Sequence, residues 1–301
     1  MPDLIHRGAR FLARRTFSFW EKLGLHLTYV HYYEPIPDTR NLDDGVWNRS
    51  AGLPGIKMND ALQAELLQQL SAAYRKTWEG LPRNRASKPG QFFLGNEWFD
   101  SGDAEILHGI IRRFKPPRIY EIGSGFSSLL AAQAIRENRE ENHSYSCEHI
   151  AIEPNPPQFL SKGNNGISVI RKKVQEIPLD TFARLKRNDV LFIDSSHVLT
   201  IGSDVQYEYL EILPRLKPGV LVHCHDIFLP AEYPKDWVLG YHRFWNEQYL
   251  LQAFLTHNSE FEVLWAGSYM HLKHPNLLAA AIPSYRQEEC HPKSFWIRRR
   301  G

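Results

Sequence analysis

Four polar residues whose side chains suit proton transfer follow two neighbouring apolar runs of the sequence. Asp194 directly follows one run, and His197 comes three residues later. His225 and Asp226 end the next run. Histidine titrates near neutral pH and can accept the proton of a hydroxyl group. We therefore expect His197 to be a general base, with Asp194 and Asp226 lining the reaction centre. Two alternatives for His197 are a bond to Asp204 at a helix start and a contact that orients the substrate.

A glycine-containing turn follows an earlier apolar run. Residues 118–122 end in Glu121-Ile122, and the chain continues as Gly123-Ser124-Gly125 before a helical pattern. Glycine allows a sharp turn and a close approach of a ligand to the backbone. The helix start adds free N–H groups and a partial positive charge. Ligands of open α/β sheets bind at this edge, beyond the carboxyl ends of the strands. The predicted cofactor-binding residues here are Glu121, Gly123, Ser124, Gly125, Ser127 and Ser128.

Two further observations concern the kind of cofactor. Glu153 lies at the end of the second predicted strand, where a carboxylate can accept hydrogen bonds from both hydroxyls of a ribose. A turn that binds NAD has the pattern Gly-x-Gly-x-x-Gly, but Ser128 occupies the position of its third glycine. The pattern therefore disfavours NAD, although an NAD-dependent oxidoreductase stays an alternative.

An acidic residue two positions before Gly-x-Gly resembles the first motif of the class I S-adenosylmethionine-dependent methyltransferases. Residues 93–299 are covered by this resemblance. It implies that the turn holds the methionine part of S-adenosylmethionine, that Glu153 holds the ribose, and that Gln175 and Glu176 border the adenine. Asp194 is expected to line the same cofactor site. A member of this family that has lost catalysis and only binds ligands is a second alternative.

The segment from Asp194 to His197 resembles the catechol-type O-methyltransferases, in which a basic lysine stands three residues after the strand-end aspartate. Those enzymes hold Mg²⁺ with Asp, Asp and Asn, whereas Ile227 stands here after Asp226 and cannot bind a metal. Asp194, His225 and Asp226 could instead hold a divalent metal softer than Mg²⁺. The alternative is that His225 and Asp226 are acid/base or substrate-binding residues. The resemblance implies O-methylation of a small molecule or a sugar hydroxyl.

Short apolar runs that alternate with helical patterns predict the fold that positions these residues. The chain is expected to have an α/β fold with a Rossmann-like, seven-stranded, mostly parallel sheet and helices on both faces. The resemblance implies that the last strand is antiparallel. The predicted strands are 118–122, 147–153, 167–171, 189–194, 219–225, 260–266 and 294–299. The predicted helices of this part are 127–137, 179–186, 204–215 and 246–257.

The part before the sheet has a different pattern. Helical periodicity is found in residues 3–24, from Asn59 to near Gly80, and after Ser101. We therefore predict an N-terminal helical extension at 1–92 and a methyltransferase-like domain at 93–301. The arginine-rich first helix is expected to dock on the core or on a second subunit, as in a homo-oligomer, rather than on an anionic membrane.

Composition limits the partners. The chain has 301 residues, 43% of them hydrophobic, and a net charge of +2. That charge gives no reason to expect a nucleic acid, so we expect a small-molecule acceptor. The three cysteines show no metal-ligand spacing and indicate a reducing, cytoplasmic location. No segment has the apolar length of a transmembrane helix or the pattern of a signal peptide.

Overall fold

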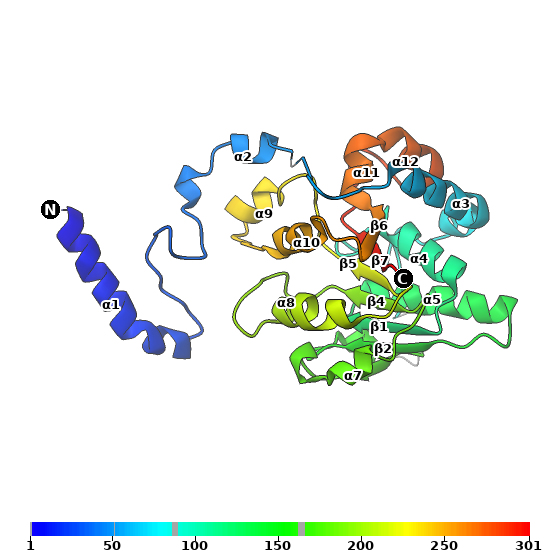
Figure 1. Ribbon diagram of the computed structural model, residues 1–301, viewed down its shortest axis with the longest axis horizontal. Coiled ribbons are helices and arrows are strands. Elements are labelled where there is room, and N and C mark those ends of the chain that lie inside the picture. The colour runs from blue at the N-terminus through cyan, green and yellow to red at the C-terminus, as the bar shows by residue number, and fades with distance from the viewer. Residues whose placement is uncertain (1, 51, 86–89, 162–165) are drawn as a thin grey trace. The chain divides into compact units, whose positions relative to one another are not determined.

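The computed structural model of the chain describes residues 2–50, 52–85, 90–161 and 166–301 (Figure 1). The chain divides into two compact units. One comprises Met1–Arg49 and Pro234–Phe244, and the other comprises Ser50–Tyr233 and Trp245–Gly301. The larger unit contains the whole sheet, and each unit is described by itself.

A seven-stranded sheet forms the centre of the larger unit, with the strand order β3-β2-β1-β4-β5-β7-β6. Strands β3, β2, β1, β4 and β5 run parallel to one another, and β7 runs antiparallel to its neighbours β5 and β6. The predicted α/β fold and the antiparallel last strand are thereby confirmed. The strands are β1 Arg118–Ile122, β2 Glu148–Ile152, β3 Ser168–Ile170, β4 Val190–Ile193, β5 Leu221–Cys224, β6 Phe261–Ala266 and β7 Phe295–Arg299.

Helices cover both faces of this sheet, as predicted (Figure 1). Alternate residues of a strand point to opposite faces, so Ile119 packs with one group of helices while Tyr120 and Ile122 pack with the other. The first face is covered by α3 Asp60–Glu79, α4 Asp103–Phe114, α5 Phe126–Glu141, α11 Gly267–Lys273 and α12 Pro275–Ala281. The second is covered by α7 Leu179–Phe182, α8 Asp204–Tyr207, a π-helical turn Glu208–Ile212 and α10 Glu247–Leu255.

The order of the strands reverses direction at β1. The chain proceeds outward from β1 to β2 and β3, and then returns to β4 on the other side of β1. Ligands of open α/β sheets bind beyond the carboxyl ends of the strands at such a switch point. Short elements follow these ends, namely α6 Gln158–Ser161 after β2 and the 3₁₀ turn Val174–Glu176 after β3. The loop from Asp194 to Ser203 follows β4.

Helix α3 belongs to the larger unit, although the sequence places it in the N-terminal extension. Leu70 and Trp78 are buried in the core that α4 shares. The side chain of Gln63 is buried and accepts a hydrogen bond from the backbone N–H of Ala266 at 2.7 Å, while its amide donates to the carbonyl of Met58 at 2.6 Å. The larger unit begins after Arg49, whereas the sequence predicted a domain boundary after residue 92. The two boundaries differ because α3 shares the core of the larger unit and is therefore not a separate extension.

The smaller unit contains three helices among the described residues, α1 Pro2–Lys22, α2 Gly45–Asn48 and α9 Lys235–Leu239. Helix α1 confirms the predicted N-terminal helix, and the indole N–H of Trp20 donates to the hydroxyl of Thr16 one turn earlier. The ammonium group of Lys235 lies 5.5 Å from the ring centre of Trp47. None of the helices in the described parts of the chain combines the length and apolar character needed to cross a bilayer.

Candidate functional site

A pocket of about 440 Å³ lies beyond the carboxyl ends of β1, β2 and β4. It is the place where the sequence predicts the cofactor. Of the predicted cofactor-binding residues, Gly123, Glu153, Gln175 and Asp194 line it. The loop after β4 forms the opposite wall through Thr200–Ser203. The structure therefore brings Gly123 and Asp194 together, although 71 positions separate them in the sequence.

Gly123 is required by the geometry of the turn. Its φ of +85° is one that L side chains rarely adopt. A Cβ at this position would lie 1.9 Å from the carbonyl oxygen of Asp194, because β1 and β4 are neighbours. The backbone N–H of Gly123 also donates to the carbonyl of Ile152 at 3.0 Å. Gly123 thus lets three strand ends meet at the pocket.

The rest of the turn forms the start of α5. Gly125 has an extended backbone, and no atom would lie within 4 Å of a Cβ placed on it. Its N–H donates to the hydroxyl of Ser128 at 3.2 Å. Ser127 and Ser128 are buried, and the hydroxyl of Ser124 is buried without a hydrogen-bond partner among the described residues. Open space at Gly125 beside the N–H groups of a helix start is suited to a ligand.

Glu121 has a different environment from its neighbours in the turn. Its side chain is fully buried and lies 3.1 Å from Nε2 of His149 on β2. It is absent from the lining of the 440 Å³ pocket. Because Glu121 alternates with Tyr120 and Ile122 along β1, its side chain points into the face covered by α4 and α5. The cofactor-binding role of Glu121 stays a prediction.

The structure distinguishes the other predicted cofactor residues by what their side chains contact. The carboxylate of Glu153 accepts a hydrogen bond from the N–H of Asn155 at 2.7 Å and lines the pocket. The amide of Gln175 donates to the carbonyl of Gly202 at 2.9 Å and so bridges the two walls. Glu176 instead caps its own 3₁₀ turn by accepting from the N–H of Lys173 at 2.9 Å, and it does not line the pocket.

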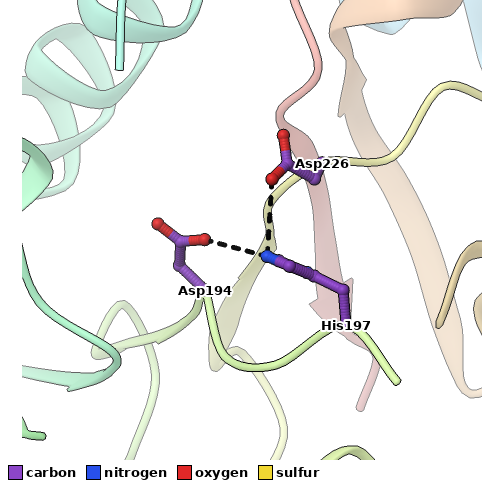
Figure 2. Close-up of side chains that lie close together, drawn as sticks. All are labelled: Asp194, His197 and Asp226. Atoms are coloured by element: carbon purple, nitrogen blue, oxygen red, sulfur yellow. Dashed lines mark ion pairs between the residues drawn. The ribbon is translucent and has the colours of Figure 1, made fainter. Parts of the chain in front are cut away.

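Asp194, His197 and Asp226 meet beside this pocket (Figure 2). Nε2 of His197 lies 3.3 Å from an oxygen of Asp194 and 3.4 Å from an oxygen of Asp226. His197 and Asp226 both have positive φ, of 61° and 53°. Such backbone strain costs on the order of 1–3 kcal/mol and is concentrated at functional sites. The three predicted catalytic residues therefore form one cluster.

Three residues that the sequence analysis did not single out complete the cluster. Glu247, at the start of α10, lies 2.7 Å from Nδ1 of His197 through Oε2. Its other oxygen accepts a hydrogen bond from the hydroxyl of Tyr209 at 2.9 Å. The ammonium group of Lys293 lies 2.8 Å from Asp226. Asp204, an alternative partner for His197, instead accepts a hydrogen bond from the N–H of Ser196 at 3.0 Å.

The charges of the cluster set its protonation states. Burial disfavours the charged form of His197, but hydrogen bonds to the Asp194 and Glu247 carboxylates outweigh burial and raise the pKa of His197 well above its usual range. Burial likewise opposes ionisation of Asp226, and the neighbouring His225 and Lys293 outweigh it and lower the pKa of Asp226. Burial, helped by the nearby Glu247 charge, raises the pKa of Glu208 well above its usual range.

The donor set fits a divalent cation. Within the described part of the chain, one group of acidic, histidine or cysteine residues has ligand atoms within 4.8 Å of one another, and it consists of Asp194, His197 and Asp226. Two carboxylates and one imidazole suit borderline metals such as Zn²⁺ or Fe²⁺. The predicted set contained His225 in place of His197. The ring of His225 instead contacts Phe99, with 5.1 Å between ring centres, and Nδ1 lies 3.3 Å from His223.

Comparisons with known proteins agree with this geometry. Residues 120–227 match a family model described as a methyltransferase domain. An uncharacterized protein from Archaeoglobus fulgidus is 26% identical over 166 residues, which are 52% of this chain and 73% of that protein.

Two solved structures are similar. One is the S-adenosylhomocysteine (SAH)-bound Podospora anserina methyltransferase PaMTH1, with 15% identity, a TM-score of 0.41, and coverage of 91% of this chain and 100% of that chain. The other is the plantazolicin methyltransferase BpumL with a triazolic desmethylPZN analog and SAH, with 14% identity, a TM-score of 0.38, and coverage of 79% and 99%.

Proposed function

We propose that this chain, an S-adenosylmethionine-dependent methyltransferase with the class I fold, methylates a hydroxyl group of a small molecule or a sugar. The observation that carries the proposal is the cluster of Asp194, His197 and Asp226 beside the pocket lined by Gly123 and Glu153. Asp194 belongs to both, so an acceptor at the cluster lies next to the cofactor.

The cofactor supplies an activated methyl group on a sulfonium, and the protein has to align it with the acceptor. The open space at Gly125, at the start of α5, supports a site there for the methionine part, and the pocket-lining carboxylate of Glu153 is the candidate acceptor of hydrogen bonds from the ribose. Gln175, which lines the same pocket and bonds to Gly202, is the candidate neighbour of the adenine. Alignment of two reactants can contribute about 7–11 kcal/mol to lowering the barrier.

The acceptor hydroxyl has to lose a proton as the methyl group arrives. Nε2 of His197 is the candidate base because it faces the space between Asp194 and Asp226. A positioned base contributes about 10²–10⁴ in rate. The raised pKa of His197 favours its doubly protonated, imidazolium form in the ligand-free site. The proton on Nε2 has to leave before His197 can act as the base.

As an alternative to proton acceptance by Nε2 of His197, a divalent ion held by Asp194, His197 and Asp226 would supply Lewis-acid polarisation of the acceptor oxygen. Lys293 affects metal binding by Asp226, because its ammonium group already forms an ion pair with one carboxylate oxygen of that residue. The pKa of Lys293 is lowered by burial but raised more strongly by Asp226, so the ammonium form persists. Asp226 is oriented by Lys293 at one carboxylate oxygen and by His197 at the other.

Two measurements test the proposal. Isothermal calorimetry should detect binding of S-adenosylmethionine and SAH and none of NAD, and the reverse result would refute the cofactor assignment. Transfer of a radiolabelled methyl group should then be measured on paired acceptors, such as catechol with o-phenylenediamine and a methyl hexoside with its amino-sugar counterpart. We expect products methylated on oxygen. Methylation on nitrogen only, in the amine member of each pair, would contradict O-methylation.

A further inference from the structure

We propose that Glu247 is a positioning residue that fixes the imidazole of His197 so that Nε2, and not Nδ1, faces the reaction centre. The inference deepens the proposed function, because it concerns the candidate base of that reaction. It assigns a role to a residue that lies 50 positions after His197 and has no recognisable sequence motif.

Both oxygens of the Glu247 carboxylate are held by short contacts. Oε2 lies 2.7 Å from Nδ1 of His197, and Oε1 accepts a hydrogen bond from the hydroxyl of Tyr209 at 2.9 Å. The side chain of Glu247 has no exposed surface, so water does not compete for either oxygen. A carboxylate whose two oxygens are both engaged cannot rotate without breaking a buried hydrogen bond, which costs about 1–3 kcal/mol.

The backbone of the same helix start holds the main chain of His197. The carbonyl of His197 accepts hydrogen bonds from the N–H of Asn246 at 3.1 Å and from the N–H of Glu247 at 3.3 Å. These contacts accompany the positive φ of His197, a conformation that is rare for a residue with a side chain. The ring of Trp245 packs on the imidazole, with 4.4 Å between ring centres. Residues 245–247 therefore hold both the backbone and the ring.

The chemical consequence is that the two ring nitrogens of His197 have different roles. Nδ1 is committed to Glu247, which leaves Nε2 between Asp194 and Asp226. The hydrogen bond made by one nitrogen of a histidine decides which nitrogen is free to accept a proton or bind a ligand. Carboxylate partners of this kind typically change activity about 10- to 100-fold when they are removed. The same argument holds whether Nε2 accepts a proton or contacts a metal.

Nuclear magnetic resonance of the full chain, with ¹⁵N-labelled histidine and bound SAH, tests the geometry without an acceptor. We expect one Nδ1 proton far downfield, as is typical of an imidazole bonded to a carboxylate, and we expect His197→Gln to remove it. Glu247→Gln keeps the shape of the side chain but removes its charge, and should move the signal upfield. Tyr209→Phe, which frees Oε1, should move it less. Glu262→Gln, at the opposite end of the sheet, should leave it unchanged.

Kinetics then separates positioning from folding. On any acceptor methylated in the paired panel, Glu247→Gln should lower kcat about 10- to 100-fold, with KM and the affinity for SAH within about twofold of the wild type. Glu247→Asp, which restores the charge at shorter reach, should recover part of kcat. An unmoved His197 signal in a folded Glu247→Gln variant would overturn the inference. If that variant does not fold, an unmoved signal and an unchanged kcat in Tyr209→Phe would overturn it. Absence of SAH binding by the wild type would refute the proposed function instead.

Discussion

At the scale of single residues, Gly123 and Gly125 make different demands on the chain. Gly123→Ala would place a methyl group 1.9 Å from the carbonyl oxygen of Asp194 at a φ of +85°. The unfavourable φ alone costs roughly 1–2 kcal/mol, and the clash adds to it. Gly125→Ala meets no protein atom within 4 Å. We therefore expect Gly123→Ala to lower the free energy of unfolding in urea, and Gly125→Ala to leave it unchanged.

The same pair separates folding from ligand binding. The open space at Gly125 is where the methionine part of the cofactor is proposed to lie, so Gly125→Ala should weaken SAH binding at least about tenfold, which corresponds to 1.4 kcal/mol. Gly52→Ala is a matched control, because Gly52 also has open space around it and does not line the cofactor pocket. Full SAH affinity in Gly125→Ala would place the methionine part elsewhere.

The raised pKa of His197 makes stability depend on pH. A histidine whose pKa is higher in the folded than in the unfolded chain stabilises the fold fully below its unfolded pKa, near 6.5, and loses that effect as pH rises through its folded pKa. The free energy of unfolding of the wild type, relative to His197→Gln, should therefore be greatest below about pH 6.5 and decline as pH rises above it. Urea titrations of both proteins measure this difference. A difference that is constant or increases with pH would contradict a raised pKa.

At the scale of elements, the start of α10 is hydrogen-bonded to the loop after β4. Asn246 accepts a hydrogen bond from the N–H of Leu199 at 2.6 Å, and the same loop lines the cofactor pocket at Thr200–Ser203. Asn246→Ala removes this bond, which is worth about 0.5–1.5 kcal/mol. We expect faster hydrogen exchange at the N–H of Leu199 and a several-fold loss of SAH affinity. Asn258→Ala, beyond the other end of α10, is the control. Unchanged exchange at Leu199 would show that the loop is held by other contacts.

The strands and the site at their ends differ in how far sequence could predict them. Apolar runs of five to seven residues between turn signals predicted every strand to within two residues, because a buried parallel strand needs an apolar side chain at nearly every position. Asp194 and Asp226 could be predicted to lie at the site because they stand at the ends of β4 and β5. Glu247 and Lys293 could not be predicted in this way, because their roles depend on where α10 and the segment before β7 pack. Sequence order contains no signal for that packing.

Short helices were also missed. The sequence analysis predicted no helix between β6 and β7, yet α11 and α12 lie there. Each has seven residues, and Pro275 begins the second directly after the first. Two turns of helix offer too few apolar positions for a periodic pattern to be recognised. Their stability comes from packing, since Met270 and Leu278 are fully buried in the core beside α3.

At the scale of the whole molecule, α3 decides where a foldable piece of the chain begins. Leu70 packs against Gly109 of α4, where an added Cβ would lie 3.0 Å from a methyl group of Leu70. The indole N–H of Trp78 donates to His108 at 3.1 Å in the interior. Removing α3 would expose this face of α4 and leave the N–H of Ala266 without the side chain of Gln63. Burial of each large apolar side chain contributes about 1.5–3 kcal/mol.

A chain of residues 50–301 retains the sheet, its pocket and α3. It should therefore fold, unfold cooperatively when urea is added, and bind SAH with nearly the affinity of the full chain. A chain of residues 93–301, cut at the boundary expected from sequence, should aggregate or unfold at a much lower urea concentration. Circular dichroism and calorimetry on both pieces measure these outcomes. Equal stability of the two pieces would show that α3 is dispensable and would restore the boundary at residue 92. Loss of SAH binding in a folded 50–301 piece would show that the removed residues are needed for cofactor binding.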